Sequence, residues 1–262
     1  MSPPFVADLH LHTQASDGTL TIADIPEAAK EAGVDWVAVT DHDRIHSELD
    51  DTISTIDGIT IIRGIELRVQ TETQRIDLLG FQVEPTDELQ AEIDRLQQNR
   101  LKRAQKIIAC VEAELGITLD IEPSSGIGRP HIATAIDESS APYDYTEAFE
   151  ELIGTDCECY YSRDVTAVDD GIRLLKEACS IVGLAHPLRY DDPEAALKHT
   201  EKLDAVERYY PYGREIDTNS IDQAIERNDL LETGGSDAHN KRLGKAGLSS
   251  SQFNKFKSKL RL

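Results

Sequence analysis

The sequence lacks the long apolar run that a membrane-spanning helix requires. Its N-terminus also lacks the basic start and apolar middle of a signal peptide. We therefore expect a cytoplasmic protein with no membrane partner. The 262 residues contain no internal repeat and no low-complexity segment. This length allows one large α/β domain or two small ones, and one domain with an insertion is the preferred interpretation.

Cysteine is also scarce. The four cysteines, Cys110, Cys157, Cys159 and Cys179, have neither the density of a disulfide scaffold nor the paired spacing of a zinc knuckle. We therefore expect all four to be reduced thiols. Cys157 and Cys159 flank a single residue and could bind a metal, but the sequence offers no second pair near them.

Basic residues are few relative to acidic ones. The chain has 27 Lys and Arg against 49 Asp and Glu, a formal net charge of -22 and a pI near 4.6. Such self-repulsion destabilises a compact state in dilute buffer and is screened by salt. Because the acids are scattered along the whole chain, we hypothesise a halophilic protein adapted to a salty cytoplasm. The same charge argues against binding long duplex nucleic acid.

Short apolar runs alternate with amphipathic stretches, which is typical of a parallel α/β fold. Strands are expected at residues 5–11, 36–40, 59–66 and 75–81, the last two as a hairpin, with a helix at 21–32. Helical spacing then dominates residues 85–163. The alternation resumes with helices at 167–178, 193–201 and 215–227. The sequence thus predicts an α/β domain from residues 1–84 and 164–262, interrupted by a helical insertion domain at 85–163.

The first predicted strand carries His10 and His12. Residues two apart on a strand point the same way, so both imidazoles can face one ion while Leu9 and Leu11 enter the core on the other side. The pair after the last predicted strand, Asp237 and His239, repeats this spacing.

Other histidines and acids also follow predicted strands: Asp41, His42, Asp43, Glu66 and His186. Loops at the carboxyl ends of parallel strands share one face, so these side chains are expected to converge. Imidazoles and carboxylates together suit zinc, manganese or iron, and a carboxylate can bridge two ions. Neighbouring ions could clamp a phosphate and activate a bound water.

Each motif alone has a structural alternative. A His-x-His pair arises by chance, the acids after the second strand can cap a helix, and "GSDAH" can form a turn and a cap. Glu66 could be a solvated strand-end acid, and His186 a hydrogen-bonded loop histidine. Their joint occurrence at strand ends favours a metal site. His46 and His199 are interpreted as structural histidines.

Six separated motifs, "DLHLHTQASDGTL", "AVTDHD", "GIEL", "GRPHIA", "GLAHPLRY" and "GGSDAH", occur in the order found in the PHP (polymerase and histidinol phosphatase) family. The chain resembles this family over nearly its whole length, and most of all its stand-alone phosphoesterases. The resemblance implies a distorted (β/α)7 TIM-like barrel with metals at the carboxyl ends of the strands. It also implies a small helical insertion domain, which residues 85–163 would supply.

The resemblance further implies a ligand set for two or three divalent ions, manganese, zinc or iron. A first ion would be held by His10, His12, Glu66 and Asp237. Another would be held by Asp17, His42 and His239. Glu66 would bridge to an ion that His186 completes.

One position departs from the family pattern. Related sequences tend to have a histidine in a strand that reads like "VHLLGY", whereas this chain reads "RIDLLGF" with Asp77 at that place. A carboxylate can still bind a metal, so Asp77 is counted among the expected ligands with a harder metal preference. Whether it reaches an ion stays open at this point.

Three arginines near the motifs fit a phosphorylated substrate: Arg129, Arg163 and Arg189. Their guanidinium groups can bind phosphate oxygens bidentately, although each could equally be a structural ion-pair partner. His131 could protonate a leaving oxygen, contact phosphate or bind a metal, and phosphate contact is preferred. Catalytic roles are assigned to Asp237 and His131.

The sequence thus predicts a metal-dependent phosphoesterase for phosphate esters of nucleotides or short oligonucleotides, of the 3',5'-bisphosphate nucleotidase or 5'-3' exoribonuclease type. The alternatives are a histidinol-phosphate phosphatase and a non-catalytic metal-binding PHP module.

Overall fold

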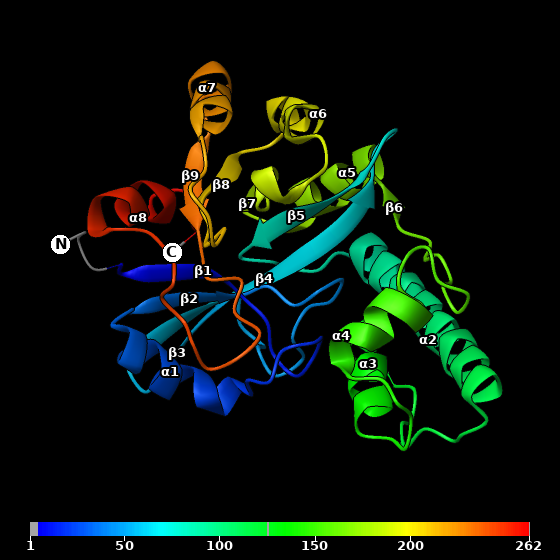
Figure 1. Cartoon of the computed structure of the whole chain (residues 1–262). Helices are drawn as coiled ribbons and strands as arrows, with labels where there is room; N and C mark the ends of the chain where they lie inside the picture. The colour runs from blue at the N-terminus through cyan, green and yellow to red at the C-terminus, as the bar shows by residue number, and fades with distance from the viewer. Residues whose placement is uncertain (1–4, 125, 262) are drawn as a thin grey trace. The chain divides into compact units, whose positions relative to one another are not determined.

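The computed structural model describes residues 5–124 and 126–261 (Figure 1). Residues 1–4 and 262, the outer ends of the predicted α/β domain, lie outside this range. The chain divides into two compact units. The larger unit runs up to Glu92 and resumes at Val165, and the smaller unit is Ile93–Asp164. Among the described residues, none of the helices combines the length and apolar character that a membrane crossing requires.

The larger unit contains a nearly closed sheet (Figure 1). Its strands follow the order β1 Ala7–Leu11, β2 Trp36–Val39, β4 Ile59–Gln70, β5 Arg75–Phe81, β7 Ile181–Leu184, β8 Ala205–Tyr209 and β9 Leu231–Gly234. Beyond β9, the carbonyl of Ala238 accepts a hydrogen bond of 2.9 Å from the N–H of His12, which joins the two ends of the sheet. The predicted barrel-like α/β fold is confirmed.

The sheet departs from a regular barrel at β5, which is antiparallel to both β4 and β7. The predicted β4–β5 hairpin is therefore present. Two short strands that the sequence pattern did not reveal, β3 Ile53–Ile56 and β6 Thr166–Ala167, also pair with β4. Because β5 is reversed, its first residues lie beside the last residues of β4, so both ends serve the same edge of the sheet.

Helices α1 Ile25–Ala32, α5 Val168–Ala178, α6 Pro193–Lys198, α7 Asn219–Asn228 and α8 Ser250–Lys257 complete the larger unit. Their apolar faces are buried: Ile25 of α1 belongs to one core cluster and Phe256 of α8 to another. Leu9 and Leu11 were expected to enter the core together, and this expectation is wrong in detail. Both are buried, but Leu9 packs in the cluster with Phe256 and Leu11 in the cluster with Ile25. A bulge between Asp8 and Leu11 interrupts the alternation.

Helix α2 Asp87–Leu115 begins in the larger unit and continues into the smaller one. The smaller unit also holds α3 Arg129–Asp137, α4 Tyr145–Glu147 and a π-helical turn at Ala148–Ile153. Its core includes Val111, Ile132, Ile136 and Ile153, all fully buried.

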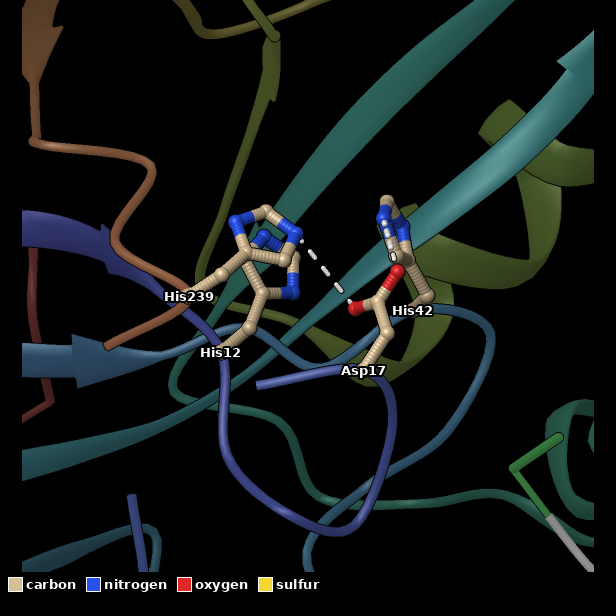
Figure 2. Close-up of side chains that lie close together, drawn as sticks. All are labelled: His12, Asp17, His42 and His239. Carbon is tan, nitrogen blue, oxygen red and sulfur yellow. Dashed lines mark ion pairs between the residues drawn. The ribbon is translucent and has the colours of Figure 1, made fainter. Parts of the chain in front are cut away.

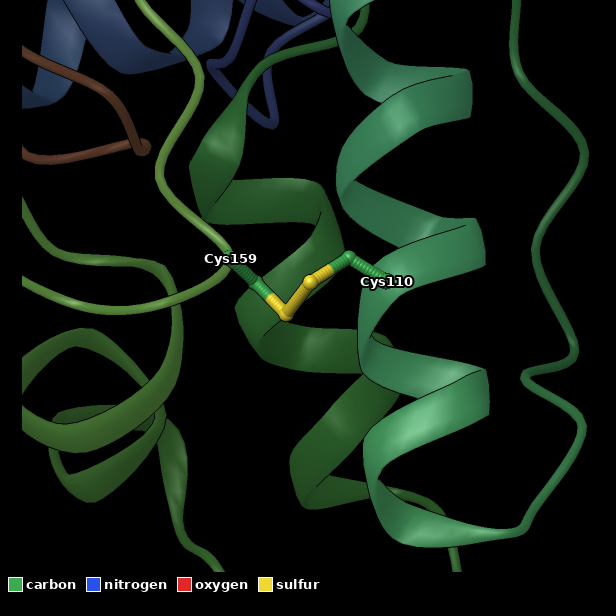
Figure 3. Close-up of a disulfide and its surroundings, with 2 residues drawn as sticks. All are labelled: Cys110 and Cys159. Carbon is green, nitrogen blue, oxygen red and sulfur yellow. A yellow bond between two sulfur atoms is a disulfide. The ribbon is translucent and has the colours of Figure 1, made fainter.

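A disulfide joins Cys110 of α2 to Cys159 across 49 residues of sequence (Figure 3). The expectation of four reduced thiols is therefore wrong for this pair and correct for Cys157 and Cys179. Cysteine spacing along the chain did not reveal the bridge, because the two Cα atoms come within 5.6 Å of each other only in the folded unit.

Candidate functional site

The larger unit gathers histidines and acids at one edge of the sheet. His10 lies on β1, and His42 follows β2. Glu66 lies on β4, His186 follows β7, and Asp237 follows β9. Histidines and acids from five separate segments thus lie at one edge of the sheet, as the convergence of strand ends predicts.

These side chains form three groups in which ligand atoms lie within 4.8 Å of one another. We call them together the histidine centre. The groups are His12, Asp17, His42 and His239 (Figure 2); His10, His12 and Asp237; and His10, Glu66 and His186. Of the predicted metal ligands, Asp77 alone belongs to none of the groups found among the described residues.

Glu66 lies between the groups, as a bridging carboxylate would. Its Oε2 is 2.7 Å from Nδ1 of His42, and its Oε1 is 3.0 Å from Nε2 of His186. The same carboxylate is 3.5 Å from the rings of His10 and His12. Since this side chain is only 1% exposed, it is a buried anion compensated by imidazoles on several sides.

The proximity of imidazoles and carboxylates shifts their proton affinities. Burial opposes charging of His10, but the carboxylates of Glu207 and Asp237 outweigh it and raise the pKa of His10 well above its ordinary value. Burial likewise opposes charging of His42, and the carboxylate of Glu66 raises its pKa. Burial would raise the pKa of Asp237, but the neighbouring imidazoles, His10 first, hold it well below its usual range. The centre is thus an array of buried charges of both signs.

His239 gives this array a measurable pH dependence. Burial lowers its pKa, but a hydrogen bond to Asp17 prevails and raises the pKa of His239 to about 9. Below that pH the imidazole carries a proton that a metal ion must displace, so metal affinity should rise by at least about tenfold per pH unit between about pH 7 and 9. Calorimetric titration with Mn²⁺ in buffers of different ionisation enthalpy should show at least one more proton released at pH 7 than at pH 9.5. An affinity that is the same at both pH values would contradict this prediction.

Three residues beside the strand ends have left-handed backbone conformations. Asp43, His186 and Asp237 have φ of 49°, 26° and 48°. Non-glycine residues adopt such values at an energetic cost, and they concentrate at functional sites where the fold imposes them. The fold imposes this conformation on His186 and Asp237, and both side chains belong to the histidine centre.

Two buried carboxylates hold the loops of the site rather than contributing to the three groups. Asp41 accepts hydrogen bonds from the backbone of Thr13 at 2.8 Å and the hydroxyl of Ser16 at 2.6 Å, which fixes the loop that carries Asp17. Asp8 accepts from the backbone N–H groups of residues 236 and 244 and fixes the loop that follows β9. Asp8 therefore has a supporting role that the sequence analysis did not assign, and Asp41 accepts a backbone N–H as its structural alternative proposed, but from a loop and not from a helix.

Glu207 is a further functional residue that sequence reasoning missed. It is fully buried on β8, its Oε1 is 3.0 Å from Nδ1 of His10, and its Oε2 accepts the backbone N–H of His186 at 2.8 Å. A carboxylate on Nδ1 fixes the orientation of an imidazole whose Nε2 faces a metal. A charged residue near the carboxyl end of a barrel strand was the signal that could have revealed it.

Replacing Glu207 by glutamine should lower metal affinity by about 10- to 100-fold while keeping the side-chain shape, because the orienting charge on His10 is lost. The measurement is a competition titration of the metal-free protein with a chelating dye. Glu232→Gln is the matched control, since Glu232 lies on the adjacent strand β9 and accepts a hydrogen bond from Tyr209. Equal affinities for the Glu207→Gln variant and the wild type would contradict the role.

The residues present fit divalent metal ions. Nε2 of His10 is buried and has no hydrogen-bond partner in the part of the chain that the structure describes. It lies 3.5 Å from a carboxylate oxygen of Glu66 and 3.5 Å from one of Asp237. A buried nitrogen without a hydrogen-bond partner is costly, and the mixture of nitrogen and oxygen donors is that of transition-metal sites.

Two further predicted residues, Arg189 and Asp77, form hydrogen bonds to side chains beside the histidine centre. Nη1 of Arg189 donates to Asp237 at 2.9 Å, and the hydroxyl of Tyr210 donates to the same oxygen at 2.8 Å, so Arg189 lies at the rim of the centre. Both oxygens of Asp77 accept hydrogen bonds from Arg68.

The remaining predicted substrate residues, Arg129, His131 and Arg163, belong to the smaller unit. The guanidinium of Arg129 stacks over Phe149, Nδ1 of His131 accepts the N–H of Gly128 at 3.1 Å, and Arg163 is 8% exposed.

Comparisons with known proteins agree with this geometry. Residues 8–152 match the PHP domain family. The chain is 27% identical over 261 residues to a phosphoribosyl 1,2-cyclic phosphate 1,2-diphosphodiesterase of Eggerthella lenta, covering 90% of this chain and 95% of that one. It is 26% identical over 192 residues to a 3',5'-nucleoside bisphosphate phosphatase of Chromobacterium violaceum, covering 70% and 67%. It is also 26% identical over 195 residues to a 5'-3' exoribonuclease of Escherichia coli, covering 71% and 67%.

Among solved structures, the chain resembles a protein of Bifidobacterium adolescentis assigned as a metal-dependent phosphoesterase. The TM-score is 0.79 at 25% identity, and the match covers 98% of each chain.

Proposed function

The chain belongs to the PHP domain family, and from this premise we propose that this metal-dependent phosphoesterase hydrolyses phosphate esters carried on ribose, in nucleotides or short oligonucleotides. The three relatives named above act on a phosphoribosyl cyclic phosphate, a nucleoside bisphosphate and RNA. A phosphorylated ribose is common to these substrates. The observation that carries the proposal is the convergence of imidazoles and carboxylates in the histidine centre.

We propose that the three groups of the histidine centre hold two or three divalent ions. Manganese, zinc and iron all suit the nitrogen and oxygen donors. When bound, such ions would activate a water and neutralise negative charge on the phosphoryl oxygens. Asp237 stays anionic because the nearby imidazoles hold its pKa low, which suits a ligand that also orients a water. Tyr210 and Arg189 keep its other oxygen occupied.

We propose that Arg189 of the larger unit binds substrate, whereas Arg129, Arg163 and His131 of the smaller unit stay predictions from the sequence. Arg189 has a half-exposed side chain held against Asp237, so its remaining donors can bind a phosphate oxygen. His131 accepts a backbone N–H at Nδ1, so its neutral form carries the proton on Nε2. This N–H can donate a hydrogen bond to a phosphate oxygen.

The test is hydrolysis by the purified full chain loaded with Mn²⁺ or Zn²⁺. The substrates are nitrophenyl phosphate, adenosine 3',5'-bisphosphate, a 5'-phosphorylated RNA trinucleotide, a ribose 1,2-cyclic phosphate and histidinol phosphate. We expect turnover of at least one ribose ester, with a higher kcat/KM than that for histidinol phosphate. A preference for histidinol phosphate, or metal binding without turnover of any ester, would overturn the proposal.

A cytoplasmic location remains part of this proposal. Disulfides are uncommon in reducing compartments, so the redox state of the Cys110–Cys159 pair in the cell is the measurement that tests this location.

A further inference from the structure

An arginine that no sequence motif contains lies beside the histidine centre. Arg68 of β4 is directly opposite Asp77 of β5 in the antiparallel pair. Its Nε and Nη2 donate to the two oxygens of Asp77, both at 2.7 Å. Because the planar guanidinium matches the carboxylate at two points, the pair fixes the orientation of Arg68.

The pair adjoins the third group of the centre. Glu66 precedes Arg68 by two residues on β4, so both side chains are on the same face of the strand. Oδ2 of Asp77 is 3.8 Å from Nε2 of His186, which is itself 3.0 Å from Glu66. The guanidinium of Arg68 is therefore part of the electrostatic surroundings of that group.

Exposure differs sharply between the two partners. The side chain of Asp77 is 1% exposed, whereas that of Arg68 is 41% exposed. The carboxylate of Asp77 raises the pKa of Arg68, so the guanidinium stays charged at every working pH. Nε and Nη2 donate to Asp77, so the donors of Nη1 are not used by this carboxylate.

Arg189 has a similar arrangement at another group of the centre. Its Nη1 is bound to Asp237, and its side chain is 52% exposed against 8% for the aspartate. Two half-exposed guanidinium groups, each held by a buried carboxylate, thus lie beside different groups of the histidine centre. An anion bound at the centre would therefore have a guanidinium group beside each of these two groups of ligands.

We propose that Arg68 is a substrate-binding residue whose Nη1 contacts a phosphate oxygen, and that Asp77 is its counterion rather than a metal ligand. The inference rests on the proposed function for the identity of the substrate, but phosphate binding itself can be tested without turnover. A metal ion at Asp77 would have to displace Arg68 from the same oxygens, and the two cations would repel each other.

The experiment measures the dissociation constant of inorganic phosphate for the metal-loaded full chain by calorimetry. Arg68→Gln should weaken phosphate binding by about 10- to 100-fold, because a charged hydrogen bond is lost. Arg68→Lys, which keeps the charge without the fork, should lose less. Arg75→Gln is the matched control on the same hairpin, where Arg75 contacts the neutral side chain of Gln70, and should bind phosphate as the wild type does.

Metal content, measured by mass spectrometry on the same preparations, separates the two roles of the carboxylate. Asp77→Asn should retain the full metal content, whereas His186→Ala should lose metal. Metal loss in Asp77→Asn, unchanged phosphate affinity in Arg68→Gln, or equal weakening in Arg75→Gln would overturn the inference. If no ester is turned over but Arg68→Gln still weakens phosphate binding, the proposed function fails and the phosphate contact stands.

Discussion

Replacing His12 by alanine should reduce hydrolysis by about 10³-fold or more, because water activation and charge neutralisation are both impaired. His12 is fully buried and belongs to two of the three groups. The loss of this imidazole therefore removes a metal ligand from the centre. Its Nε2 is also 3.0 Å from Asp237, so the substitution leaves that carboxylate without one of its partners.

The measurement combines turnover of the best ribose ester with metal content on the same preparation. His199→Ala is the matched control, because His199 begins a 3-10 turn and belongs to none of the metal groups among the described residues. The control should keep wild-type turnover. A His12→Ala variant that binds its metals fully and hydrolyses within a few-fold of the wild type would contradict the prediction and the proposed function with it.

Removing the Cys110–Cys159 bridge should destabilise the smaller unit by about 4 kcal/mol, the chain-entropy value for a loop of about 50 residues. A small helical unit buries little apolar surface per residue, so a crosslink that restricts its unfolded chain contributes a large share of its stability. The effect should be confined to the smaller unit, since both cysteines lie within it.

Urea unfolding of the full chain, with and without a reductant, measures this contribution. The double variant Cys110→Ala, Cys159→Ala should behave as the reduced wild type does. Cys157→Ala is the control, because its thiol is free and lies two residues from the bridge. Superimposable unfolding curves for the oxidised protein and the double variant would show that the bridge contributes nothing.

The acidic composition predicts how stability depends on salt, and not where any residue lies in the fold. A net charge of -22 predicts greater stability in concentrated salt, but it carries no information on the arrangement of the chain. The halophilic interpretation therefore remains a prediction from composition.

The sequence by itself located most of the helices and strands and the histidines and acids that gather in the larger unit. Apolar periodicity is a local property, so it located β1, β2 and β4 within a few residues. Histidines and acids that follow buried strands indicated the centre, because strand ends of an α/β sheet share one edge. His10, Glu66 and Asp237 were all found in this way.

Only the tertiary structure decided which partners these residues have. Glu207 contacts His10 across 197 residues of sequence. Arg68 pairs with Asp77 because the register of β4 and β5 places them opposite each other. Cys110 forms a disulfide with Cys159 across 49 residues. Periodicity states which side of a strand or helix is buried, but the choice of partner depends on the register and packing of distant segments. Those are properties of the whole fold, because a contact between two side chains requires both backbones to be placed.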